Sequence, residues 1–209
     1  MKINQRTQSL LLAALALGLA GAARAADPMS SASVPPSGTM GLLGQTYAGL
    51  TYSYVDLNHS SSHTDDYRFD FNQPLNANLD SILSYDFLQT GSLKQQALVG
   101  AFRAYSTAYT WGKPYAEAGA GYTWERGDGG HDNSLLWEVA VGTEFQLAPA
   151  WSVTPFVQYQ GTPDLARRDQ WIYGVKANYW VDRQWALTAG VDRDNHQAMR
   201  YTVGTNFRF

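Results

Sequence analysis

The sequence predicts an all-β protein, an antiparallel up-and-down barrel of ten strands that spans a membrane. From residue 45 onward, apolar and polar residues alternate with a period of two, which is typical of strands with one apolar face. Beyond the N-terminus, no apolar run approaches the roughly 20 residues that a membrane-spanning helix needs. The chain also contains 7 Trp, 13 Tyr and 8 Phe, and these aromatic residues fall in the alternating pattern. The two faces of each strand therefore meet different solvents.

The first 25 residues have the pattern of a secretory signal peptide. Lys2 and Arg6 precede an apolar run at 10–19, and Ala23-Arg24-Ala25 fits the small-x-small cleavage pattern. A membrane anchor is the alternative, but the run is about half the length of a spanning helix. No Cys follows it, which excludes a lipoprotein anchor. We expect export through the Sec pathway and cleavage after residue 25.

Residues 26–44 are rich in Ser and Pro and are expected to form a flexible periplasmic segment before the barrel domain at 45–209. Removing the leader with its three basic residues leaves 12 Lys and Arg against 18 Asp and Glu. This acidic balance does not suggest a nucleic-acid partner. The chain has no Cys, so no disulfide supports the exported domain.

Ten segments carry the alternation, and most are close to the 9–11 residues that a tilted membrane strand needs. The clearest is the last, in which 201, 203, 205, 207 and 209 are apolar or aromatic except for Thr205. The weakest is 96–106, whose phase places Val99 and Ala101 inward; if it is misassigned, eight strands is the alternative, since single-chain bacterial barrels have even numbers. The expected strands are 45–56, 66–73, 79–89, 96–106, 114–125, 134–147, 152–161, 170–180, 185–193 and 199–209.

The connections alternate in length, as they do in bacterial barrels. Segments 74–78, 107–113, 148–151 and 181–184 are expected to be short periplasmic turns, whereas 57–65, 126–133 and 161–169 are longer, polar, and expected outside the cell. Both termini then lie on the periplasmic side.

Closure follows from the cost of unpaired backbone groups in hydrocarbon, because only a closed sheet has no edge. A soluble lipocalin-like barrel or β-sandwich would need an apolar interior, and it would have to accommodate many charged residues there. Tryptophans near strand ends are expected to form the aromatic girdles of a membrane barrel. These are Trp111, Trp137, Trp151, Trp171, Trp180 and Trp185.

Charged residues fall on the polar face of these strands, which predicts a charge network in the lumen. A barrel of about eight strands is just filled by side chains, and buried charges need partners. We therefore favour an interior filled by ion pairs, with a narrow, mildly cation-favouring channel as the alternative. The expected network comprises Arg68, Asp70, Asp80, Asp86, Arg103, Glu117, Glu125, Glu138, Glu144, Lys176, Asp192, Arg200 and Arg208.

The last strand resembles the outer-membrane β-signal, with Thr202, Gly204, Phe207 and the terminal Phe209 at the matching positions. The segment 113–122 resembles the "KPYxxxGxGY" strand of small outer-membrane proteins. Over 45–209 the chain is similar to the superfamily of small outer membrane β-barrels, OmpA/OmpX-like and opacity-type. The resemblance implies recognition of the C-terminal strand by the barrel assembly machinery, an outer-membrane location among lipids and lipopolysaccharide, and a monomer. The ten expected strands depart from that family's pattern.

Two groups of residues are candidate catalytic sites. The segment Asp192 to His196, with Asp65-Asp66 as a possible second acidic pair, faintly resembles the omptin proteases, but a polar hairpin explains it better. His59-Ser60 and His131 are compatible with a lipid A deacylase, although no strand motif supports one.

The histidines also offer a possible surface metal site, formed by residues 59, 63 and 131, but solvated loop residues are the better interpretation. We therefore expect no catalytic residues, metal or cofactor. The sequence favours a structural or surface-interaction role, with a passive channel and an outer-membrane lipid-modifying enzyme as alternatives.

Overall fold

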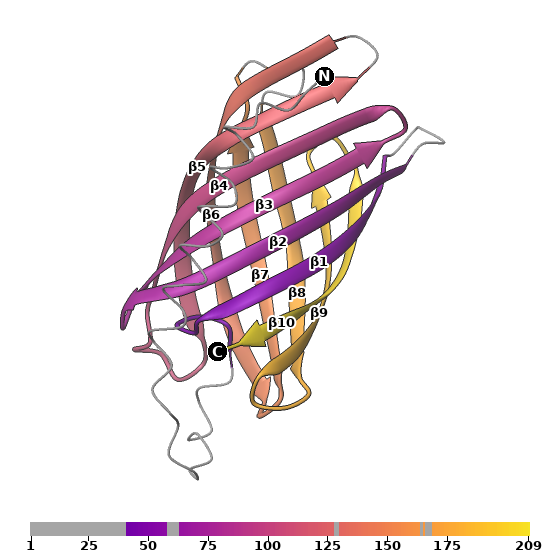
Figure 1. Ribbon diagram of the computed structural model, residues 1–209. Helices are drawn as coiled ribbons and strands as arrows, with labels where there is room; N and C mark the ends of the chain where they lie inside the picture. Colours follow the sequence, from indigo (N-terminus) through magenta and orange to yellow (C-terminus); the bar gives the residue numbers. More distant parts are fainter. Residues whose placement is uncertain (1–40, 58–62, 128–129, 164, 166–168) are drawn as a thin grey trace. The chain divides into compact units, whose positions relative to one another are not determined.

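The computed structural model describes residues 41–57, 63–127, 130–163, 165 and 169–209, and these residues form ten β-strands (Figure 1). The predicted strand number is confirmed, and the eight-strand alternative is wrong. No helix of the described part is long and apolar enough to cross a membrane. The strands are β1 (Tyr47–Asp56), β2 (His63–Asn76), β3 (Leu79–Thr90), β4 (Leu93–Tyr105), β5 (Lys113–Gly127), β6 (Gly130–Ala148), β7 (Trp151–Gly161), β8 (Asp169–Trp180), β9 (Trp185–Asp194) and β10 (Met199–Arg208).

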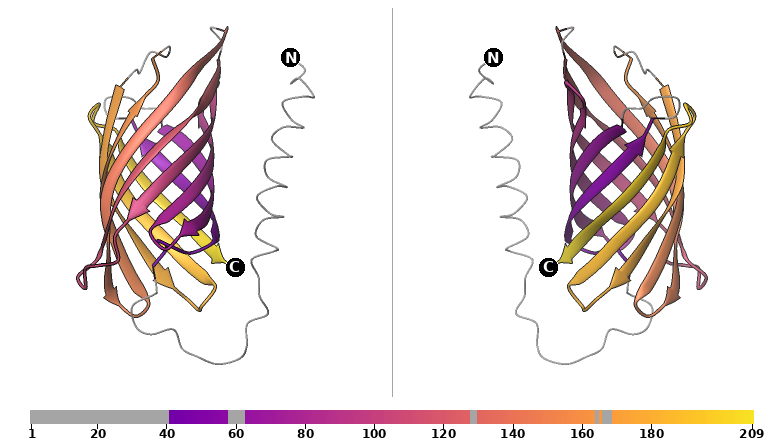
Figure 2. Two further views of the ribbon diagram at one scale, coloured as in Figure 1. Left: turned by 90° about the vertical axis from the view of Figure 1, so that its left-hand side faces the viewer. Right: turned by 90° about the vertical axis from the view of Figure 1, so that its right-hand side faces the viewer.

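Each strand pairs antiparallel with its neighbours in the chain, and β10 pairs with β1 to close the barrel. Figure 1 shows this seam, with β10 in yellow beside β1 in indigo, and Figure 2 shows the tilted strands from two further sides. Tyr47 lies opposite Arg208, so β1 begins where β10 ends. We call this end of the barrel the base and the opposite end the rim. The closed ladder leaves no strand edge in contact with lipid, as a membrane barrel requires.

Several connections are shorter than the sequence predicted. The expected loop 126–133 is wrong, because β5 and β6 pair through it up to Gly127 and Gly130. The expected loop 57–65 is shortened from its far side, since β2 already begins at His63. At the base, β2 continues past Pro74 with a shift in register, which shortens the expected turn 74–78. Alternation in the flanking strands simply continues into these polar segments.

The two faces of the sheet have the predicted polarity. Leu50, Phe102 and Val203 are more than half exposed on the outside. Inward-facing Thr123 and Ser152 are completely buried. Apolar packing inside is slight, since the described residues contain a single cluster of buried apolar side chains, formed by Ala97, Val99 and Leu136. A water-soluble barrel would show the reverse pattern, so the soluble alternative is wrong and the barrel has the two faces of a transmembrane protein.

Aromatic side chains meet across neighbouring strands near both ends of the barrel. Toward the rim the ring centroids of Trp137 and Tyr159 are 5.0 Å apart; at the base those of Trp151 and Tyr179 are 4.8 Å apart. Trp180 does not belong to this outer set, contrary to the sequence prediction. It lies on the inward phase of β8 and is only 3% exposed.

Candidate functional site

The interior is the candidate site, and its polar contacts change from base to rim. At the base, Glu144 on β6 and Asp80 on β3 point inward and are almost fully buried. Neither carboxylate has a basic partner among the ion pairs of the described residues. Their partners are instead the backbone of the segment that precedes β1.

Residues 41–45, which we call the N-terminal strap, lie in the base of the barrel. Glu144 accepts hydrogen bonds from the backbone N–H groups of Leu42 (2.8 Å) and Leu43 (3.4 Å), and Asp80 accepts one from Gly44 (3.0 Å). The side chain of Leu43 is buried. Residues 41–44 were expected to belong to the flexible segment 26–44; in the structure this end of it is held by charged groups. Residues 1–40, including the expected signal peptide, lie outside the described residues.

Further contacts hold the strap from the strand side. Asn72 on β2 donates to the backbone carbonyl of Gln45 at 2.7 Å, and Lys113 on β5 donates to that of Leu43 at 3.4 Å. The amide of Asn72 also donates to Asp80 at 3.2 Å. Charge-assisted bonds from buried carboxylates to backbone N–H groups are among the stronger hydrogen bonds in proteins. The strap is thus attached to β2, β3, β5 and β6.

Above the strap, two tight ion pairs lie along the lumen wall, one within β2 and one between the neighbouring strands β4 and β5. Arg103 Nε lies 2.6 Å from Glu117 Oε2, and Arg68 Nε lies 2.8 Å from Asp70 Oδ1. Ser84 completes the second pair, accepting from Arg68 and donating to Asp70. Lys176 lies over the ring of Phe156, with Nζ 5.2 Å from its centroid. We call Arg68, Asp70, Arg103, Glu117 and Lys176 the belt; Arg68 and Lys176 lie where the two cavities of the lumen meet.

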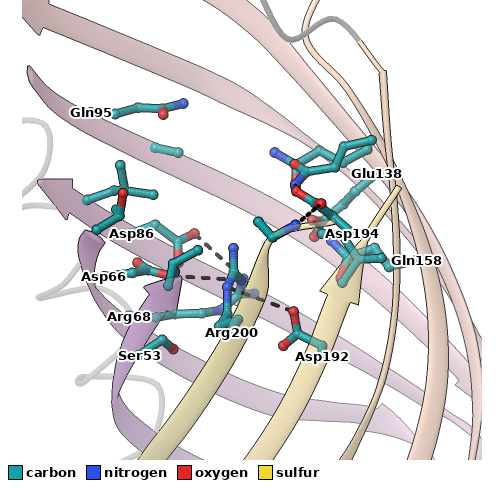
Figure 3. Close-up of a pocket in the computed structure, with 18 of the residues that line it drawn as sticks. Ser53, Asp66, Arg68, Asp86, Gln95, Glu138, Gln158, Asp192, Asp194 and Arg200 are labelled. Carbon is teal, nitrogen blue, oxygen red and sulfur yellow. Dashed lines mark hydrogen bonds and ion pairs between the residues drawn. The ribbon is translucent and has the colours of Figure 1, made fainter. Parts of the chain in front are cut away.

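Toward the rim the lumen opens into a cavity of about 440 Å³, compared with about 140 Å³ below the belt. Charged groups here are farther apart than in the belt, and Figure 3 shows those around Arg200. Arg200 lies 3.8 Å from Asp66 and 3.9 Å from Asp192, and Arg68 lies 3.6 Å from Asp86. Glu138 accepts a hydrogen bond from Gln158 at 2.8 Å. We call this space the upper cavity.

The structure places the residues of the expected charge network as follows. Asp80 and Arg208 lie at the base; Asp80 is completely buried, and the Arg208 guanidinium lies 4.8 Å from the centroid of the Trp180 ring. The remaining eleven residues line one or both cavities, namely Arg68, Asp70, Asp86, Arg103, Glu117, Glu125, Glu138, Glu144, Lys176, Asp192 and Arg200.

Two carboxylates of the upper cavity, Asp66 and Asp194, were missed as lumen residues. Inward residues of β2 and β9 have even numbers. Following this alternation from Arg68 back to residue 66 identifies Asp66, and continuing β9 by one residue identifies Asp194. Both had been assigned to strand ends or loops because polar neighbours surround them.

The expected catalytic alternatives are not assembled in the described residues. Asp194 accepts hydrogen bonds from the backbone N–H groups of His196 (2.9 Å) and Ala198 (2.8 Å), so it caps the β9–β10 turn. His63 and His131 are exposed at the rim. His59 and Ser60 lie outside the described residues, and no group of three potential metal ligands occurs in the part that is described.

Three residues of the expected assembly signal, Thr202, Gly204 and Phe207, lie on β10 at the seam. Thr202 Oγ1 is 2.9 Å from Ser53 Oγ across β10 and β1, and Gly204 faces the backbone of Leu50 and Thr51. Phe207 packs against Trp185 with ring centroids 4.8 Å apart. Phe209 is exposed.

The fold is similar to solved outer-membrane barrels at low sequence identity. The NanC porin is 9% identical to this chain, with a TM-score of 0.48, and the match covers 78% of this chain and 100% of the porin chain. The KdgM porin in complex with disordered oligogalacturonate is 11% identical, with a TM-score of 0.47 and coverages of 77% and 99%. Neisserial surface protein A is 12% identical, with a TM-score of 0.45 and coverages of 78% and 96%. No family model matches the sequence, and no curated protein matches it.

Proposed function

We propose that this chain is an outer-membrane barrel with a structural or surface-interaction role and a lumen that is closed at rest. The observation that carries the proposal is the strap, whose backbone is bound by Glu144 and Asp80 inside the base. The N-terminal signal pattern and the apolar exterior support export to the outer membrane. The base then faces the periplasm and the rim faces the outside.

The strap and the charged groups above it oppose passive flow through the lumen. The strap occupies the base, and the Arg68–Asp70 and Arg103–Glu117 pairs line the lumen wall above it. Each pair is held at hydrogen-bond distance, so a permeating ion would have to compete with a bound partner of opposite charge. The Arg103–Glu117 pair joins β4 to β5, and the hydrogen bond from Arg68 to Ser84 joins β2 to β3, as a structural role requires.

Planar bilayers test the closed state. The mature protein should give no steady open conductance, whereas a variant with both Glu144→Ala and Asp80→Ala should show frequent openings, because the strap loses its carboxylate acceptors. Asp182→Ala, which removes an exposed carboxylate from the base turn, is the matched control and should stay closed. A steady open pore in the unmodified protein would contradict the proposal.

A narrow, cation-favouring channel is the second candidate, and one observation favours it. The two cavities share Thr51, Arg68, Phe156, Gln158, Lys176 and Thr202 in their linings, so they meet at the belt. A displaced strap would then leave a continuous polar path. Reversal potentials in a salt gradient would show whether such openings select cations.

We further propose that the C-terminal strand, through Thr202, Gly204, Phe207 and Phe209, is read by the barrel assembly machinery, and that the folded protein is a monomer among outer-membrane lipids and lipopolysaccharide. Replacing Phe209 with Ser should reduce the amount of folded barrel in outer-membrane fractions of a Gram-negative host.

The lipid-modifying alternative finds no assembled site in the described residues. Lipid A mass spectra with and without the protein test this alternative.

A further inference from the structure

The upper cavity has the size of a ligand pocket and is lined by charged and apolar groups together. Its volume of about 440 Å³ lies within the range of small-molecule sites, roughly 300–1,000 Å³. It reaches from the belt to residues at the rim, including Thr90 and Leu93 beside the β3–β4 turn. The upper cavity therefore lies on the rim side of the belt.

The charges of the upper cavity are unbalanced, unlike those below it. The lower cavity is lined by three carboxylates and three basic side chains. The upper cavity is lined by three basic side chains, Arg68, Lys176 and Arg200, against six carboxylates, namely Asp66, Asp86, Glu125, Glu138, Asp192 and Asp194. When all are ionised, the upper cavity carries three excess negative charges and attracts cations.

One of these carboxylates is incompletely satisfied. Asp66 is 5% exposed, and its Oδ1 atom has no hydrogen-bond partner within the described residues. Its other oxygen is 3.8 Å from Arg200, whereas the pairs of the belt lie at 2.6 and 2.8 Å. The Nε atom of Arg200 also has no hydrogen-bond partner there. Leaving buried charged atoms without partners is costly, so the arrangement favours a group that supplies a positive charge beside Asp66.

Apolar side chains lie near this carboxylate on the inward face, whereas its neighbour on β1 is the polar Ser53. Leu88 is the cross-strand neighbour of Asp66, and Val55 pairs with Thr64 one inward position farther along β2. Both line the upper cavity, together with Leu136 and Ile172. Inward positions of a membrane barrel are normally polar, so a group of aliphatic side chains beside charged ones departs from the pattern of a water-filled pore.

We propose that the upper cavity binds small organic cations that carry an apolar or aromatic group. The cationic centre lies beside Asp66, and the neighbouring Asp86 and Asp192, which Figure 3 shows near Arg200, add negative potential. The apolar group packs against Val55 and Leu88. This inference goes beyond the closed-barrel role and does not depend on it, because the site lies on the rim side of the belt and away from the strap.

Isothermal titration calorimetry of the mature barrel in detergent micelles tests the ligand class. Benzyltrimethylammonium carries both features and should bind saturably. Tetramethylammonium lacks the apolar group, and benzenesulfonate has the opposite charge; each should bind at least roughly tenfold more weakly. Micelles without protein provide the blank for partitioning. Absence of saturable binding of benzyltrimethylammonium, or equal binding of benzenesulfonate, would overturn the proposal.

Variants test the assigned residues. Asp66→Asn should weaken benzyltrimethylammonium roughly tenfold or more, whereas Asp56→Asn, at an exposed outward position of β1, should leave it unchanged. Val55→Thr keeps the side-chain shape and should weaken benzyltrimethylammonium more than tetramethylammonium; this ratio stays informative if Asp66→Asn fails to fold. Equal affinity in all folded variants would refute the assignment. Conductance is measured separately, so a conducting barrel that binds the ligand contradicts only the closed-lumen proposal.

Discussion

Gly121 offers a sharp test of how tightly the barrel wall is packed. It faces inward on β5 opposite Val99, and a Cβ atom added there would lie 2.0 Å from the carbonyl oxygen of Leu98 and 2.8 Å from the Cα of Val99. Both are backbone atoms of β4, so no side-chain rotation relieves the contact. To bring the first distance to 3.0 Å, the two strands must separate locally by about 1 Å. We therefore expect Gly121→Ala to destabilise the barrel.

The magnitude follows from two opposing effects. Overpacking of this kind costs about 1–3 kcal/mol. Replacing Gly by Ala also stabilises by about 0.4–1 kcal/mol, because it restricts the unfolded chain. The net expectation is a loss of between about 0 and 2.6 kcal/mol in the free energy of unfolding, with a midpoint of about 1.3 kcal/mol. Gly100 on β4 is the matched control, because it faces outward and a Cβ atom there meets nothing within 4 Å.

Urea unfolding in lipid vesicles, followed by tryptophan fluorescence, measures both variants. Gly100→Ala should leave the free energy of unfolding unchanged or raise it by up to about 1 kcal/mol, and Gly121→Ala should lower it. Equal effects of the two alanines would show that the close approach of β4 and β5 does not limit side-chain size. The reasoning about inward glycines would then be wrong.

Three further predictions concern charge and lipid contact. Glu117→Gln leaves the guanidinium of Arg103 buried without its partner and should cost about 3–5 kcal/mol in urea unfolding, most of which a double replacement by Leu and Met should recover. Val157→Arg, midway along β7, should cost about 2–4 kcal/mol in vesicles, whereas Leu147→Arg near the base should cost about 0–1 kcal/mol; equal costs would argue against a lipid-facing wall. Hydrogen bonds from the backbone N–H groups of residues 185 and 184 lower the pKa of Asp182 below its usual 3.8. This stabilisation is present above pH 3.8 and disappears as the pH falls through the lowered pKa, so the melting temperatures of the wild type and Asp182→Ala should differ at neutral pH and converge in acid.

The sequence predicted the strands and their faces because both follow from a short-range pattern. Alternation needs only the residue two positions away, and it correctly placed even the least certain strand, where Val99 and Ala101 point inward. Strand ends were less accurate at 126–133, where a polar, Gly-rich segment still continues the ladder. A polar composition is compatible both with a strand hairpin that continues into solvent and with an irregular loop, so polarity alone does not distinguish them.

The contacts of the interior needed the register, which alternation does not give. Glu144 and the backbone of Leu42 are 102 positions apart in the sequence, and their contact depends on where β6 ends relative to β1. The segment before β1 has no strand pattern, so its composition indicated only a loose tail. The same limit applies to glycine, since the sequence does not show that Gly121 is crowded and Gly100 is free.

The interior charges have different roles along the barrel axis, and the distances within the ion pairs distinguish these roles. Where a carboxylate meets backbone N–H groups or a guanidinium below about 3.0 Å, as Glu144 and Glu117 do, its charge is compensated and its main effect is to hold strands and the strap in place. Around Arg68 and Arg200 the distances rise to 3.6–3.9 Å. These pairs are beyond hydrogen-bond distance, so the charges of their carboxylates are less completely compensated. A network meant only to fill the lumen would gain stability by closing those gaps with short side-chain movements. The loose pairs lie where the cavity is widest and aliphatic side chains gather, and this coincidence is better explained by an exchangeable cation than by packing.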